Sequence, residues 1–255
     1  MDNALLIGLS RQTTLRRELD IVANNIANLN TTGFKADGAV FSEYLQNGAR
    51  GEQFATPDQR ISFVQDRQTW HDLTQGAIQN TGSSLDVAID GNAYFTVQTA
   101  RGERYTRNGS FQINGQGQLV TSAGDVVLGD AGPIVFANTD RGISINPDGT
   151  IRVQEGANAV DGGRGRLRLA SFANPQSLRK DGASTFMAPE GIQPEAPPIG
   201  VRVVQGSIEK SNVRPVVEMG RMIELSRAYT EVASLLQSQS DMRRTSIERL
   251  AEVPA

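Results

Sequence analysis

Few residues in this sequence could carry out nucleophilic or thiolate chemistry. The chain of 255 residues contains one histidine and no cysteine. A Ser–His–Asp site could use only His71, and disulfides and thiolate zinc sites are excluded. His71 follows Trp70 in a polar stretch, which favours a partly exposed loop histidine.

The acidic and glycine-rich stretches also lack a recognisable catalytic pattern. Asp86 and Asp90 could form a pair of carboxylates, but Asp90-Gly91 is more typical of a turn. The stretch 140–148 lacks the spacing of a calcium loop. Residues 162–165 (Gly-Gly-Arg-Gly) precede no Lys-Ser/Thr pair, so they do not form a phosphate loop. We therefore predict that the protein is not an enzyme and uses no catalytic residue, metal or cofactor.

Composition limits the partners that the protein can have. The net charge is −3, and no block of lysine and arginine stands out, which argues against nucleic acid as a partner. Asp2 stands where a secretory signal peptide has basic residues, and no run approaches the ~20 apolar residues of a membrane span. We expect neither a cleaved signal peptide nor membrane insertion, and no small-molecule substrate.

The N-terminal residues 3–29 are predicted to form an amphipathic helix. Its apolar positions alternate spacings of four and three, the pattern of a coiled-coil seam. These positions are Leu15, Leu19, Val22, Ile26 and Leu29. The seam weakens toward the N-terminus, where Gly8 lowers helix propensity. Asparagines and Gly33 are expected to end the helix.

A second amphipathic helix is predicted at the C-terminal end, beginning near Pro215, because proline suits a first helical turn. Its seam positions are Met222, Leu225, Tyr229, Val232 and Leu236. Two arrangements of the terminal helices stay open. They could form an antiparallel hairpin within one chain, or they could stay loose in the monomer and order on assembly.

The sequence between the helices is mainly β. Short runs of apolar residues alternate with turn signals such as Asn114-Gly115 and residues 146–149 (Asn-Pro-Asp-Gly). We predict an α+β fold, in which residues 1–35 and 207–255 form a helical, coiled-coil-like core domain. Residues 85–206 form a central β domain of many short strands. Residues 36–84 form an extended or irregular connector with short strands or helical turns, the latter around Val40–Leu45.

Several stretches of the sequence resemble the flagellar rod, hook and hook-associated axial proteins. The first combines Ala23-Asn24-Asn25-Ile26-Ala27-Asn28 with Thr32-Gly33-Phe34-Lys35. Others are residues 90–95, residues 105–111 (Tyr-Thr-Arg-Asn-Gly-Ser-Phe) with 117–124, and residues 205–229. They occur in the family's order over the whole chain. The length and the opening residues are most similar to the proximal rod protein of the flagellar basal body.

This resemblance implies a structural subunit of the rod that polymerises through its terminal helices into a helical, torque-transmitting shaft. It also implies export through the flagellar type III apparatus, a periplasmic location, and contacts with itself and with other proximal and distal rod proteins. A distal rod or hook-type protein is the alternative within the family. Outside it, a secreted binding module with a β domain would explain the central strands but not the paired helical seams.

Overall fold

The structure is a computed structural model that describes residues 2–46, 61–156 and 160–251. Its internal contacts divide the chain into two units. Unit 1 contains Met1–Ala27, Asp37–Trp70 and Arg214–Ala255, and unit 2 contains Asn28–Ala36 and His71–Val213. The predicted α+β class is confirmed, since terminal helices and a central antiparallel β region are both present. The three-part domain division stays a prediction about how the chain folds.

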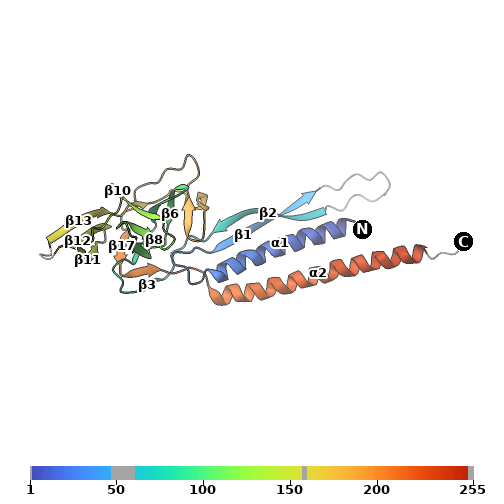
Figure 1. Ribbon diagram of the computed structural model, residues 1–255. Coiled ribbons are helices and arrows are strands. Elements are labelled where there is room, and N and C mark those ends of the chain that lie inside the picture. Colours follow the sequence, from blue (N-terminus) through green and yellow to red (C-terminus); the bar gives the residue numbers. More distant parts are fainter. Residues whose placement is uncertain (1, 47–60, 157–159, 252–255) are drawn as a thin grey trace. The chain divides into compact units, whose positions relative to one another are not determined.

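Unit 1 consists of two helices and a β-hairpin. The helices are α1 (Asp2–Ala27) and α2 (Pro215–Ala251), and the hairpin pairs β1 (Asp37–Gln46) with β2 (Ile61–His71). The helices lie side by side (Figure 1) and run antiparallel, because Gly8 faces Leu236 whereas Glu18 lies 3.9 Å from Arg221. The intramolecular hairpin of helices is therefore the arrangement found in the monomer. No helix in the described ranges is long and apolar enough to cross a membrane.

Both helices start or stop where local chemistry favours it. Pro215 occupies the first helical position of α2, as predicted. α1 ends at Ala27, so the prediction that the helix continues to residue 29 is wrong by two residues. A turn follows at once, in which the backbone N–H and the hydroxyl of Thr31 donate to the carbonyl and the side-chain oxygen of Asn28. The backbone bond spans three residues instead of the four of an α-helix, so the helical hydrogen-bond ladder does not continue here.

The prediction left short strands and helical turns both open around residues 40–45, and the structure has a strand there. The segment Asp37–Gln46 is strand β1, which pairs with β2 over the hairpin. A distant strand supplies backbone partners that a short helical segment lacks, so tertiary pairing overrides the local apolar spacing. Near the open end of the hairpin, the indole of Trp70 covers Gly38, where a Cβ atom would lie 2.3 Å from the ring nitrogen.

Unit 2 contains four antiparallel sheets in the described part of the chain. The largest has the order β15-β16-β6-β5-β9-β8-β7, with β10 and β14 attached to β9 and β5; the others are β11-β12-β13, β17-β4 and β18-β3. The strands are β3 (Ile78–Asn80), β4 (Val87–Asp90), β5 (Tyr94–Thr99), β6 (Gly102–Thr106), β7 (Phe111–Ile113), β8 (Leu119–Thr121), β9 (Val126–Gly129), β10 (Gly132–Pro133), β11 (Asp140–Ile145), β12 (Thr150–Glu155), β13 (Val160–Arg166), β14 (Leu169–Ala170), β15 (Arg179–Lys180), β16 (Thr185–Met187), β17 (Arg202–Gln205) and β18 (Ser207–Glu209), with the short 3-10 helix η1 at Pro175–Ser177.

The predicted turns connect these strands. Asn114 begins the β7–β8 turn and accepts backbone hydrogen bonds from Gln116 and Gln118. In the turn 146–149, the N–H of Gly149 donates to the carbonyl of Asn146, and Gly149 has a φ of 85°. Residues 134–136 follow β10 and contact the neighbouring strands through one isolated bridge and backbone hydrogen bonds.

Two hydrophobic clusters form the core of unit 2. The larger gathers buried side chains from β4, β5, β7, β8, β9, β11, β12 and β17, with Phe95 and Ile151 fully buried. The smaller is aromatic and includes Tyr94, Tyr105, Phe172 and Phe186. Because alternate residues of β5 point to opposite faces, Phe95 and Val97 enter the first cluster while Tyr94 enters the second. This pattern holds the strands in a fixed register.

Candidate functional site

The predicted helical seam forms one side of the contact between α1 and α2. Leu15, Val22 and Leu225 are buried there. Leu19, Ile26, Tyr229 and Val232 pack against them and are partly buried, together with Ala228. Leu236 continues the contact at the Gly8 end, where a Cβ atom on Gly8 would lie 2.6 Å from its Cδ2 atom. Gly8 thus allows α1 and α2 to approach closely. The sequence indicates only its low helix propensity and does not predict this role.

Two predicted seam residues do not belong to this contact. The Met222 side chain is 40 % exposed on α2. Leu29 lies beyond the end of α1, in the turn that belongs to unit 2. Other apolar side chains of α2 are also exposed, including Val216 (83 %), Met219 (51 %) and Ile223 (56 %).

Asn25 of the family motif connects α1 to the start of β1 within unit 1. Its side-chain oxygen accepts a hydrogen bond from the backbone N–H of Asp37 at 2.9 Å. Its amide donates to the carbonyl of the same residue at 2.9 Å and to Glu218 at 3.4 Å. The carboxamide therefore takes the place of a neighbouring strand at Asp37. Ala23 and Asn24, the two residues before Asn25, have exposed side chains.

The remainder of the motif lies in unit 2, where the chain threads between backbone segments. Asn28 forms the turn described above, and Thr32 is half-buried. Gly33 has a φ of 69°, and a Cβ atom there would lie 2.4 Å from the backbone of Arg107 and Asn108. Its N–H donates to the carbonyl of Glu209 at 2.8 Å. The position requires glycine for its conformation and for the close approach.

Phe34 and Lys35 are both fully buried. The ammonium group of Lys180 lies 3.8 Å from the centroid of the Phe34 ring, a cation–π contact. The ammonium group of Lys35 donates to the carbonyl of Thr74 at 2.6 Å and forms an ion pair with Glu209 at 2.6 Å. Burial of a lysine at this depth requires such partners.

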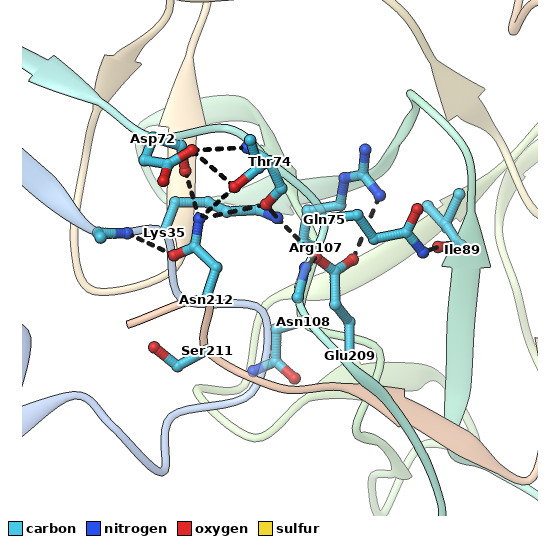
Figure 2. A network of polar contacts seen from close by, with 12 residues as sticks. Lys35, Asp72, Thr74, Gln75, Ile89, Arg107, Asn108, Glu209, Ser211 and Asn212 are labelled. Carbon is cyan, nitrogen blue, oxygen red and sulfur yellow. Dashed lines mark hydrogen bonds and ion pairs between the residues drawn. The ribbon is translucent and has the colours of Figure 1, made fainter. Parts of the chain in front are cut away.

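Glu209, at the end of β18, is the centre of a buried polar network (Figure 2). One carboxylate oxygen accepts from Lys35 and from the backbone N–H of Gly76 at 2.9 Å. The other oxygen accepts a hydrogen bond from Arg107 at 3.2 Å. The guanidinium group of Arg107 also lies 5.0 Å from the centroid of the Tyr94 ring. Figure 2 shows these groups pointing toward one another from segments that are far apart in sequence.

Asn212 forms a second carboxamide bridge in this network. Its oxygen accepts from the N–H of Ala36 at 2.8 Å, and its amide donates to the carbonyls of Asp72 at 2.7 Å and Thr74 at 3.2 Å. The N–H of Asp72 donates to the carbonyl of Ala36 at 2.8 Å. The chain on both sides of Lys35 is therefore fixed by backbone contacts as well as by the ion pair.

Burial governs the titration of this network. Loss of solvation lowers the pKa of Lys35, while the charge of Glu209 and its hydrogen bond oppose that shift. Burial likewise raises the pKa of Tyr94, against the nearby positive charge of Arg107. Both charges of the Lys35–Glu209 pair are satisfied inside the protein, so the arrangement fixes chain segments relative to one another within unit 2.

The residues that were considered as catalytic or ligand-binding candidates take part in ordinary hydrogen bonds, ion pairs, ring contacts or strands. Asp86 accepts from Thr81 at 2.6 Å, and Asp90 forms an exposed ion pair with Arg202 at 2.9 Å beside the turn at Gly91. The ring of His71 lies edge-on to Phe186. Residues 162–165 belong to strand β13. Across the ranges that the structure describes, His, Cys, Asp and Glu side chains do not gather in groups of three or more suited to a metal ion.

Sequence reasoning identified Lys35 but not the residues that bury it. Glu209, Arg107 and Asn212 are separated from it by more than seventy residues in sequence, and charge patterning gives no sign that a surface-type residue is buried. A signal was nevertheless present, since Arg107 and Asn212 lie within the stretches that carried the family resemblance.

Three family profiles match the chain, in order along it. The profile described as "Flagella basal body rod protein" matches residues 5–35. "Flagellar hook protein FlgE/F/G D1 domain" matches residues 88–153, and "Flagellar basal body rod FlgEFG protein C-terminal" matches residues 204–250. The first and third cover most of the terminal helices, and the second covers much of the core of unit 2.

Similar proteins match over almost their whole length. The flagellar basal-body rod protein FlgF of Caulobacter vibrioides is 40 % identical over 254 residues, covering 99 % of this chain and 100 % of the relative. FlgF of Mesorhizobium japonicum is 31 % identical, with 98 % of each chain covered. The rod protein FlgG of Bacillus subtilis is 31 % identical, covering 99 % of this chain and 98 % of the relative.

Terminal helices paired in one unit, and a many-stranded β unit with a buried polar network in the other, are the features expected of a structural protein of the axial type. The matches are consistent in order, length and motif with that class. The chain belongs to the flagellar basal-body rod protein family, and the recognised likeness to the proximal rod type is confirmed. A structural role in the rod of the basal body follows from membership.

Proposed function

We propose that this protein polymerises, through its terminal helices, into the helical shaft of the rod that transmits torque, and that it acts there without catalysis. The observation that carries the proposal is a second apolar face on α2. Val216, Met219 and Ile223 follow spacings of three and four, so they share one side of the helix. Ile223 lies about 200° around the helix from Leu225, which faces α1.

This second face is available to other subunits because α1 covers only the opposite side of α2 within the chain. Contacts between different faces of identical subunits form a helical filament whenever the rotation from one subunit to the next does not close into a ring. Each buried Val, Met or Ile side chain contributes about 1.5–3 kcal/mol relative to exposure. Partners of this face are therefore other copies of the chain and other rod subunits, proximal or distal.

The proposal extends to location and delivery. We infer a periplasmic position in the rod and export by the flagellar export apparatus, with no role for nucleic acid or a small-molecule substrate. Both inferences rest on the family, whose members carry the name of basal-body rod proteins.

The test replaces one exposed side chain of α2 in the host and purifies the basal bodies. Ile223→Asp should stop assembly at an incomplete rod without a hook, because a charge replaces apolar surface needed by a neighbour. The matched control is Ile113→Asp on β7, an exposed isoleucine of unit 2 (39 % exposed), which should leave rods intact. Complete rods and hooks in the Ile223→Asp strain would contradict polymerisation through this face.

Deletion of the gene supplies the complementary measurement. A rod subunit should be present in wild-type basal bodies, and its loss should remove rod and hook together. If intact rods and hooks persist without the chain, the alternative of a secreted β-domain binding module becomes the better explanation.

A further inference from the structure

The segment Asn28–Ala36 is attached to unit 2 without contributing to its hydrophobic cores. Both hydrophobic clusters are made of side chains between Leu73 and Val203, so they are complete without the segment. Backbone contacts tie it down instead. Gly33 donates to Glu209, and Asp72 donates to the carbonyl of Ala36, each at 2.8 Å. The segment therefore lies on a core that does not need it for apolar packing.

The charges in the polar network are arranged asymmetrically around this segment. Glu209 has three donors, and two of them, Arg107 and the N–H of Gly76, belong to His71–Val213. Lys35 comes from the segment itself, and its ammonium group is held by Glu209 and the carbonyl of Thr74. When the segment leaves, Glu209 keeps a cation and a backbone donor, while Lys35 regains water.

Opening of the segment is thus compatible with a folded β unit. A buried carboxylate that lost all its partners would be costly, but Glu209 would remain paired with Arg107. The released ammonium group of Lys35 would recover its hydration, which offsets part of the lost contact. The largest free-energy cost of opening is the exposure of Phe34 to water, since this side chain is fully buried beside Lys180 in the closed state.

We propose that Asn28–Ala36 is a latch that detaches from His71–Val213 and redocks as one piece, with the charge of Lys35 as its holding contact. Opening exposes Phe34, while both cores of unit 2 stay folded. The latch is a local opening of the kind that amide exchange detects. It does not depend on rod assembly, so it is testable in the monomer.

The test is amide hydrogen exchange, measured residue by residue by NMR on the full chain. Lys35→Glu places a second carboxylate against Glu209. We expect exchange at Gly33 and Asp72 to accelerate at least about 100-fold, the loss typical of removing one partner of a buried ion pair. Amides of β5 in the core, such as Val97, should change less than about threefold. The matched control is Lys210→Glu, the same charge change at an exposed neighbour of Glu209, which should leave both sets unchanged.

A second variant tests whether the latch opens when the segment is displaced without any change to the charge of Lys35. Gly33→Val clashes with the backbone of Arg107 and Asn108 and disfavours the positive φ, so it should release the segment sterically. Exchange at Asp72 should again accelerate while Val97 stays protected. The proposal is overturned if both variants lose protection at Val97 as strongly as at Asp72, because the segment is then part of the core. It is also overturned if Lys35→Glu leaves Gly33 and Asp72 protected.

Discussion

Substitution of Glu209 by glutamine is the sharpest test of the buried network. The side chain is fully buried and accepts from Lys35 at 2.6 Å, from Gly76 at 2.9 Å and from Arg107 at 3.2 Å. Glutamine keeps the shape but removes the charge that balances two cations. Arg107 stays with unit 2 in either state of the latch, and its Nε atom already has no hydrogen-bond partner in the structure.

The cost follows from that surplus of positive charge. Removing one partner of a buried ion pair destabilises a protein by about 3–5 kcal/mol, against a total stability of about 5–15 kcal/mol for a domain. For a unit of this size each kcal/mol shifts the Tm by about 2–4 °C. Glu209→Gln should therefore lower the Tm of unit 2 by roughly 6–20 °C in calorimetry.

Two comparisons make the measurement decisive. Glu103→Gln removes the same charge from an exposed pair with Arg168 at 3.1 Å, which should cost less than about 1 kcal/mol. Lys35→Met removes the holding contact of the latch but leaves Glu209 paired with Arg107, so the melting of the β cores of unit 2 should stay within about 1 kcal/mol of the wild-type value. If Glu209→Gln melts no lower than Glu103→Gln, the network does not hold unit 2 together and the reasoning is refuted.

Three further predictions concern other parts of the chain. Leu15→Ala, at a nearly inaccessible position between α1 and α2, should destabilise the helix pair by about 2–5 kcal/mol in urea unfolding; an unchanged midpoint would argue against this packing. Asn25→Ala should leave the backbone of Asp37 without its carboxamide partner and lower stability by about 1–3 kcal/mol, with faster amide exchange at Asp37 itself as the specific sign. The hydrogen bonds from Arg164 hold the pKa of Asp140 below its ordinary value. A lowered folded-state pKa gives stability that is fully present above the unfolded pKa of about 4, so the Tm difference between wild type and Asp140→Asn should be constant above about pH 5 and should shrink as pH falls from about 4 through the lower folded-state pKa. A difference that persists at pH 2 would contradict this linkage.

The sequence predicts the parts of the fold that depend on local periodicity. The two helical seams are visible because residues such as Leu15 and Leu225 recur with spacings of three and four. The β turns are visible because Asn-Gly and Asn-Pro-Asp-Gly have few other conformations. For β1 the sequence left short strands and helical turns both open, because its partner β2 begins only after residues 47–60. Pairing at that range is decided by tertiary contacts.

The buried polar network around Glu209 could be predicted from the sequence even less than the strand pairing. Gly33, Phe34 and Lys35 were marked by the family motif, but their burial depends on segments brought together only by folding. The carboxamides of Asn25 and Asn212 act as substitutes for a neighbouring strand, and nothing in residue type distinguishes such an asparagine from one in a solvent-exposed turn. The ion pair with Glu209 joins residues 174 positions apart, which no local pattern records.

The contact between Trp70 and Gly38 gives the molecule a built-in optical label. Trp70 is the single tryptophan of the chain and belongs to unit 1. Its indole covers Gly38 and is 44 % exposed, so its emission should shift when the hairpin separates at that point. The buried tyrosines Tyr94 and Tyr105 belong to unit 2. Fluorescence excited at the tryptophan band therefore follows one unit alone, and the order in which the two units unfold can be read from the unlabelled protein.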